Sequence, residues 1–281
     1  MNMQLMLGVS VACYFISLFF LCVYKDKLNK KFATGLFIVV DIILFFVWNY
    51  ATAEKGGLKD GFMTLENISP FIFTVIPLTV FMSKKAKEYA YSTIAFLHFG
   101  MFVATLVSPE YEAIFVYRTE ANLSYAAEAM CHVLAALFGI YLMLTKQVKP
   151  DFAHWIKSVV FMLGWITFGV ILNLTLDTRC FGMNPNNYSI YMIDIFGTFE
   201  ATLIAYYFGV IIVLTVGMQT GFLLCKLVDK IKEQHLHHQA QKLVKAYYDD
   251  VNKKELAEKK KTPQDPAAEK NKVGTEQATN L

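Results

Sequence analysis

The chain contains little charge and almost no arginine. Charged residues make up 17% of its 281 residues, and only Arg118 and Arg179 among its 26 basic residues are arginine. The net charge of +3 is modest and unevenly spread. A nucleic-acid-binding protein presents a clustered basic surface, so this composition gives no support to a nucleic-acid partner.

The sequence also lacks the patterns of a disulfide-rich domain, a metal site and a repeat protein, which narrows the class of protein further. The chain has five cysteines, and we expect only Cys180 to face the outside, so no extracellular disulfide framework is predicted. His235, His237 and His238 are not joined by the Cys or carboxylate residues that would complete a metal site, so we expect no metal and no cofactor. We find no internal repeat, which removes the sequence signature of an inverted-repeat transporter.

What the chain does have is a set of long apolar segments. Most approach or exceed the roughly 20 residues needed to cross a bilayer core of about 30 Å. Backbone polar groups in lipid are satisfied within helices, so we predict an all-α polytopic membrane protein with seven transmembrane helices. The third segment is the weakest, because it is short and contains Pro70 and Pro77. The seven segments are Gln4–Tyr24, Phe32–Ala51, Ile68–Ser83, Tyr89–Val107, Asn122–Thr145, His154–Leu176 and Phe199–Leu227.

The loops between these segments differ in charge, and this sets the predicted topology. Lysines gather in the stretches 25–31 and 84–87, at Lys146 and Lys149, and from Lys226 onward, whereas the intervening loops are acidic. Lysine-rich loops stay in the cytoplasm, which places the N-terminus outside and the C-terminus inside a plasma membrane. The first segment has no basic stretch before it and no cleavage site, so we expect an uncleaved anchor.

The pattern predicts two parts: a transmembrane domain, 1–227, and a cytoplasmic tail, 228–281. Apolar residues recur at near-helical spacing in the first part of the tail, which indicates an amphipathic helix. Beyond about Lys259 the composition is typical of disorder. We expect the tail to offer a surface to a cytoplasmic protein partner.

Several ionisable residues lie inside the apolar segments, where they are costly and usually face a bundle interior or a cavity. Asp41 of the second segment and His98 of the fourth lie at matching depth in the membrane. Their positions predict that they interact, either as a structural pair or as a proton relay. The other polar residues fall in the outer half of the membrane and indicate a polar cavity open to the outside. We assign substrate-binding roles to the mid-depth residues Asp41 and His98 and to Asn173, Asp177, Asn187, Tyr188 and Asp194.

The fifth segment carries the candidate catalytic residues. Glu128 and His132 are four residues apart and therefore share one helix face. A carboxylate that accepts the imidazole N–H would orient the ring and raise its basicity, as a general base requires. A structural hydrogen-bonded pair is the alternative. Cys131 points about 100° away from His132, so it is a reserve nucleophile only if the helix is irregular there.

The order of these residues resembles that of YwaF-like bacterial integral membrane proteins. The resemblance covers about residues 10–225 and is carried by Cys131-His132-Val133, Asn173, Asn187-Tyr188 and Asp194-x-x-Gly197. Eukaryotic relatives of that family include a transmembrane acyltransferase that acts on ether phospholipids. The resemblance implies a membrane-embedded acyl-transfer or hydrolase site built on His132, with membrane lipids as partners.

One departure from the family concerns the nucleophile. The family typically carries a His-x-Cys motif at the start of the third span, where this chain reads Ile68-Ser69-Pro70-Phe71-Ile72-Phe73-Thr74. Thiolate catalysis at that position is therefore excluded, and the chain can keep the fold without the chemistry. We predict a lipid-directed acyltransferase or hydrolase. A proton-coupled transporter or substrate-binding subunit, and a non-catalytic scaffold, remain as alternatives.

Overall fold

The structure is a computed structural model that describes residues 3–56, 68–115, 123–176, 180–182 and 197–261. These residues form seven α-helices and one short 3-10 helix, and no strand occurs among them. The helices are α1 (Met3–Tyr24), α2 (Lys30–Gly56), α4 (Ile68–Leu78), α5 (Lys84–Phe115), α6 (Leu123–Leu144), α7 (Phe152–Leu176) and α9 (Phe199–Lys261), with the 3-10 helix η1 at Cys180–Gly182.

Side-chain caps define where four of these helices begin. Asn29 accepts hydrogen bonds from the backbone N–H groups of Lys31 and Phe32 at the start of α2. Ser83, Asp151 and Thr198 do the same for the third N–H beyond them, at the starts of α5, α7 and α9. Short polar side chains satisfy the free N–H groups of a first turn in this way.

Six of the helices are long and apolar enough to cross a membrane, counting only the residues that the structure describes. This confirms a helical membrane protein. The remaining helix, α4, has 11 residues and spans only about 17 Å at 1.5 Å per residue. It contains Pro77 one residue before its end, and this proline cannot donate the helical hydrogen bond to the carbonyl oxygen of Phe73. The third predicted span is thus the one that lacks the length of a crossing helix.

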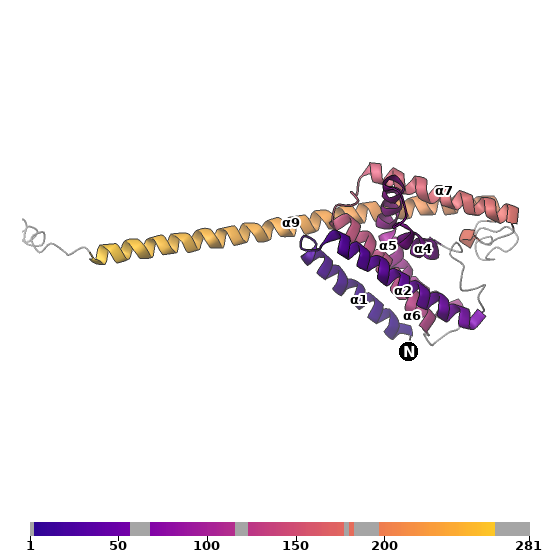
Figure 1. The fold of residues 1–281 in the computed structure, drawn as a ribbon, viewed down its shortest axis with the longest axis horizontal. Helices are drawn as coiled ribbons and strands as arrows, with labels where there is room; N and C mark the ends of the chain where they lie inside the picture. The colour runs from indigo at the N-terminus through magenta and orange to yellow at the C-terminus, as the bar shows by residue number, and fades with distance from the viewer. Residues whose placement is uncertain (1–2, 57–67, 116–122, 177–179, 183–196, 262–281) are drawn as a thin grey trace, which may run out of the picture. The chain divides into compact units, whose positions relative to one another are not determined.

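Helix α6 lies at the centre of the bundle. It contacts α1, α2, α4 and α5, and α5 in turn contacts α7 (Figure 1). Small residues allow the closest approach: a Cβ built on Gly139 of α6 would lie 2.6 Å from the carbonyl oxygen of Ile94 in α5. A Cβ on Gly217 of α9 would overlap the carbonyl oxygen of Phe96. Close contact through small residues is how helices associate in lipid, where apolar surface alone gives no preference.

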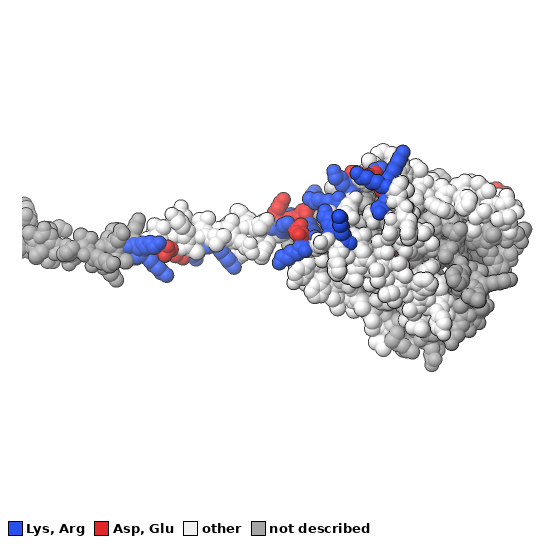
Figure 2. Space-filling view, in the orientation of Figure 1, with Lys and Arg blue, Asp and Glu red and all other residues white. Residues whose placement is uncertain are grey.

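The chain divides into two compact units, Met1–Lys226 and Leu227–Leu281. In the first unit, lysine side chains gather at one end of the visible face, and most of the remaining coloured surface is neither acidic nor basic (Figure 2). In the second unit the described residues are helical as far as Lys261. Several of their apolar side chains, including Leu236, Leu243 and Tyr247, are exposed. The stretch predicted to be disordered lies mostly outside the described residues.

Candidate functional site

His132 is deeply buried near the middle of α6, with 3% of its surface exposed. Its Nδ1 lies 2.9 Å from the backbone carbonyl oxygen of Glu128, and its ring packs edge-on against Phe73 of α4. Because a carbonyl only accepts, Nδ1 carries the hydrogen and Nε2 is left as the acceptor. The Nδ1 N–H is therefore held by the backbone, whereas we had expected the Glu128 carboxylate to hold it.

Cys131 lies beside His132 in sequence and is also buried. Helix α6 is regular from Leu123 to Leu144, so the irregularity that would bring the Cys131 thiol and the imidazole together is absent from it. The described part of the chain gives His132 a hydrogen bond to a backbone oxygen rather than to a Ser, Thr or Cys side chain that it could activate. A nucleophile for His132 would have to be water or a group on a bound substrate.

Asp41 of α2 is fully buried, and neither of its carboxylate oxygens has a hydrogen-bond partner among the described residues. It lies near enough to Cys131 for the two groups to interact electrostatically. A buried polar group without a partner costs free energy and is rare in folded proteins. Asp41 is therefore a polar position whose partner is not supplied by the described residues.

His98 of α5 does not pair with Asp41, so that prediction is wrong. Its Nδ1 donates to the carbonyl oxygen of Ala95 at 2.7 Å, and its Nε2 lies 3.2 Å from the hydroxyl of Thr220 in α9. The two residues lie at similar depth in the sequence pattern, but α5 turns His98 toward α9 while Asp41 lies near α6. Depth along a helix can be read from a sequence, whereas helix rotation cannot.

Asn173 near the end of α7 holds the backbone of η1. Its side-chain N–H donates to the carbonyl oxygen of Cys180 at 2.8 Å, and its oxygen accepts from the Cys180 N–H at 2.7 Å. Beside this clamp, Phe181 packs against Gly169 and adopts a left-handed backbone with φ 52°. A role in shaping this loop therefore accounts for the buried amide. The other candidates of this region, Asp177, Asn187, Tyr188 and Asp194, lie outside the described residues.

A cavity of about 370 Å³ lies between α4, α5 and the first part of α9. It falls within the range of about 300 to 1,000 Å³ that is usual for small-molecule sites. The described residues that line it include none of the predicted site residues, and they are mostly apolar: Ile68, Ser69, Leu97, Gly100, Met101, Ala205, Tyr206, Gly209, Val210 and Val213. The expected cavity was polar, and this one is not. The small residues Ala205 and Gly209, four apart on one face of α9, are the sequence signal that could have indicated it.

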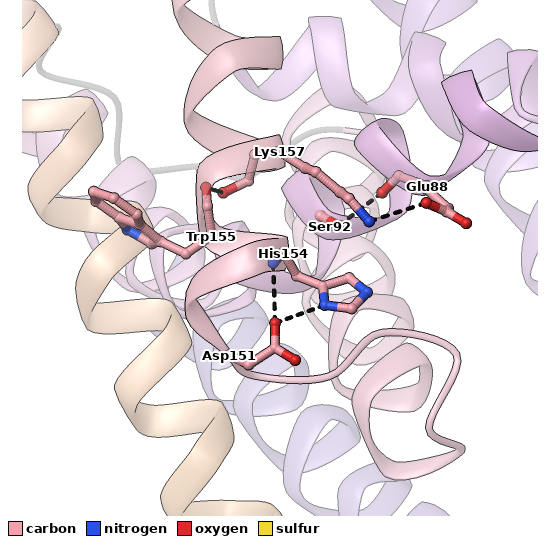
Figure 3. Close-up of polar contacts among 7 residues, drawn as sticks. Glu88, Ser92, Asp151, His154, Trp155 and Lys157 are labelled. Atoms are coloured by element: carbon pink, nitrogen blue, oxygen red, sulfur yellow. Dashed lines mark hydrogen bonds and ion pairs between the residues drawn. The ribbon is translucent and has the colours of Figure 1, made fainter.

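Polar contacts join α5 and α7 at the lysine-rich end (Figure 3), and a further one joins α7 to α9. Lys157 of α7 forms a 3.0 Å ion pair with Glu88 of α5, and the indole N–H of Trp155 donates to the hydroxyl of Thr215 in α9. Asp151 caps α7 and lies 2.7 Å from the His154 ring. Partial burial acts to raise the pKa of Asp151. The hydrogen bonds from His154, together with the positive charges of His154 and Lys149, outweigh this effect, so that the pKa of Asp151 is lowered.

No protein-family model, curated protein or solved structure matches the chain.

Proposed function

We propose that this chain is a multi-pass plasma-membrane protein that acts on membrane lipids and binds a lipid acyl chain between α4, α5 and α9. The cavity of about 370 Å³ carries this proposal, because the described residues of its lining are almost entirely apolar and none of them is charged. A water-soluble ligand would require more polar partners than the two hydroxyl side chains of Ser69 and Tyr206.

Photo-crosslinking tests the binding step directly. The full chain is reconstituted with a phosphatidylglycerol that carries a diazirine near the end of one acyl chain. After illumination, mass spectrometry should find the adduct in peptides 97–101 and 205–213. Adducts spread evenly over the exposed faces of α1 and α2 would show ordinary contact with bulk lipid and would contradict the proposal.

The proposal extends to chemistry through the resemblance to YwaF-like proteins. In it, His132 acts as the base of an acyltransferase or hydrolase, with a nucleophile provided by water or substrate. A comparison of lipidomes from cells that express wild type and His132→Ala should then show a shift in one lipid class. Phe73→Leu, which alters the ring next to His132 without removing the imidazole, is the matched control. Identical lipidomes for wild type and His132→Ala would contradict catalysis by His132 and leave only the proposed lipid binding.

The topology belongs to the same proposal: seven crossings of the membrane, the third made by the segment that contains the short helix α4, with the N-terminus outside and the C-terminus in the cytoplasm. The gathering of lysines at one end of the bundle supports it (Figure 2). Cys180 is buried and makes a poor reporter, so the test uses Glu200→Cys and Lys85→Cys, both at exposed positions, in a chain without native cysteines. An impermeant thiol reagent on intact cells should label Cys at 200 and not at 85; the reverse pattern would invert the topology.

A second candidate function is proton-coupled transport, and the Asp41 carboxyl favours it, because no described residue forms a hydrogen bond with it. A buried carboxyl with no fixed partner can exchange a proton when neighbouring helices move. Solute uptake into proteoliposomes should then depend on a pH gradient in wild type and lose that dependence in Asp41→Asn. Uptake that is unaffected by the substitution would remove this candidate.

The exposed apolar residues of the tail support a third, non-catalytic role as a scaffold for a cytoplasmic partner. Full-length protein and a chain ending at Lys226 can be compared in pull-downs from the same cells. Partners that bind both chains equally would contradict a role for the tail.

A further inference from the structure

The wall of the cavity on α9 is built from one face of the helix. Ala205, Gly209 and Val213 are each four residues apart, so they follow one another along the same side. Ala205 and Gly209 are small. Larger side chains at these two positions would occupy space that now belongs to the cavity. The size of the cavity therefore depends on what stands at these positions.

The two glycines of the lining differ in what surrounds them. A Cβ on Gly100 of α5 would lie 2.8 Å from Cγ1 of Val213, so that glycine allows α5 and α9 to approach. A Cβ on Gly209 would meet nothing within 4 Å. Packing between helices therefore does not require glycine at position 209, and its effect is to leave space in the cavity.

The position of the cavity along the helices indicates which leaflet it faces. Leu97 and Met101 lie about 20 and 26 Å along α5 from Lys84, at 1.5 Å per residue. Tyr206 and Gly209 lie about 11 and 15 Å from Phe199, where α9 begins. The cavity is thus in the half of the bundle that lies away from the lysine-rich end, which is the outer half in the proposed topology.

We propose that Gly209 determines the length of the acyl chain that this cavity accepts from a lipid of the outer leaflet. This inference rests on the proposed function, since it assumes that the cavity binds an acyl chain. Lipid tails are as apolar as the lining, so transfer from the bilayer provides no hydrophobic driving force. The preference for one lipid over another then depends on how well its acyl chain fills the cavity, because lining atoms that face unfilled space lose dispersion contacts.

The experiment compares two diazirine-bearing phosphatidylglycerols, one with myristoyl and one with stearoyl chains, in proteoliposomes that contain the full chain. Wild type should be labelled by both probes within 97–101 and 205–213. In Gly209→Phe the ring should occupy the cavity, and stearoyl labelling of these peptides should fall about tenfold relative to myristoyl labelling, as for a pocket that rejects added methylenes. Gly209→Ala should show a smaller change in the same direction.

Gly35→Phe is the matched control, because a Cβ on Gly35 also meets nothing within 4 Å and this residue of α2 does not line the cavity. It should leave the ratio of stearoyl to myristoyl labelling unchanged. If wild type shows no labelling of the cavity peptides, the proposed function fails. If wild type is labelled but the ratio stays the same in Gly209→Phe and Gly209→Ala, binding stands and the role of Gly209 is refuted. Gel filtration identifies any variant that has not folded, and Gly209→Ala then decides the question.

Discussion

Helices α1 and α6 have the same length of 22 residues, but they occupy opposite environments. α1 has the higher mean hydropathy of the two, yet few of its residues are buried in the bundle, whereas most residues of α6 are buried. In water the more apolar helix would be inside. In a membrane both environments are apolar, so hydropathy does not separate the interior of a bundle from its surface.

What does separate the two helices is the size and polarity of their side chains. The exposed face of α1 presents large residues such as Phe15 and Phe19, while α6 carries Ala135, Ala136 and Gly139 at its contacts. α6 also contains the buried polar residues Ser124 and His132. Small residues allow backbones to approach, and the buried imidazole of His132 finds its hydrogen-bond acceptor in the backbone of α6 itself.

The largest expected effect comes from replacing one glycine on each helix by alanine, which tests whether α6 is packed more tightly than α1. Gly139→Ala should destabilise the protein by about 3 kcal/mol, since its Cβ would collide with the backbone of α5 at Ile94 and Ala95. Gly8→Ala on α1 meets nothing within 4 Å and should be neutral or slightly stabilising, because alanine favours helix. Thermal unfolding in detergent, followed by gel filtration, measures both. Equal losses would mean that α1 is packed as tightly as α6.

A second test removes one aromatic ring from each helix. Phe138 of α6 is fully buried and packs with Phe37, Tyr91 and Tyr141. Phe138→Ala should cost about 2 kcal/mol, which is less than in a soluble core because lipid replaces water as the reference and mainly the cavity is penalised. Phe19→Ala on the exposed face of α1 should change stability by less than about 0.5 kcal/mol. A large loss for Phe19→Ala, measured in the same assay, would reveal a packed surface on α1.

A third test concerns the buried carboxyl of Asp41 and its effect on the stability of the bundle. The Asp41 carboxyl has no hydrogen-bond partner among the described residues, so its removal in Asp41→Leu, whose side chain has the same branching and number of heavy atoms, should stabilise the isolated protein by about 1 kcal/mol. Asp41→Asn is the control, since its amide would be equally buried and should gain little. If Asp41→Leu instead lowers the unfolding midpoint, the carboxyl has a partner in the membrane that the described residues do not include.

The smallest expected effect lies at the water-exposed, lysine-rich end. The pKa of Asp151 is lowered in the folded protein, so its contribution to stability is present above the unfolded pKa of about 3.9 and is lost as the pH falls through the folded value. Asp151 is largely solvent-screened, so less than about 0.5 kcal/mol should disappear between pH 5 and pH 3. In Asp151→Asn, which keeps a capping side chain, this part of the pH dependence should be missing. An unchanged pH profile would show that other groups cause it.

Length and composition were enough to predict the six long helices, and the caps at Asn29, Ser83, Asp151 and Thr198 are recognisable as helix starts. The sequence also marked Ile68–Ser83 as weak, because its prolines were visible. It could not show that His98 turns toward Thr220 or that Asn173 holds Cys180, since these partners depend on how each helix is rotated about its axis. The apolar cavity was missed for the same reason: its lining comes from the consecutive helices α4 and α5 and from α9, which is distant from them in sequence.

The contacts of α6 have a consequence for how the protein is made. α1 and α2 leave the ribosome first, but both pack against α6, which begins only at Leu123. Until α6 is synthesised, α1 and α2 lack the helix that both of them contact, although α4 lies beside α2 and α5 beside α1. Much of their surface must therefore be stable in contact with lipid. High hydropathy meets this need, because a lone helix is retained by its own transfer free energy. α6 inserts beside helices that are already present, so it can carry the glycine, serine and histidine that a lone helix would carry at a cost.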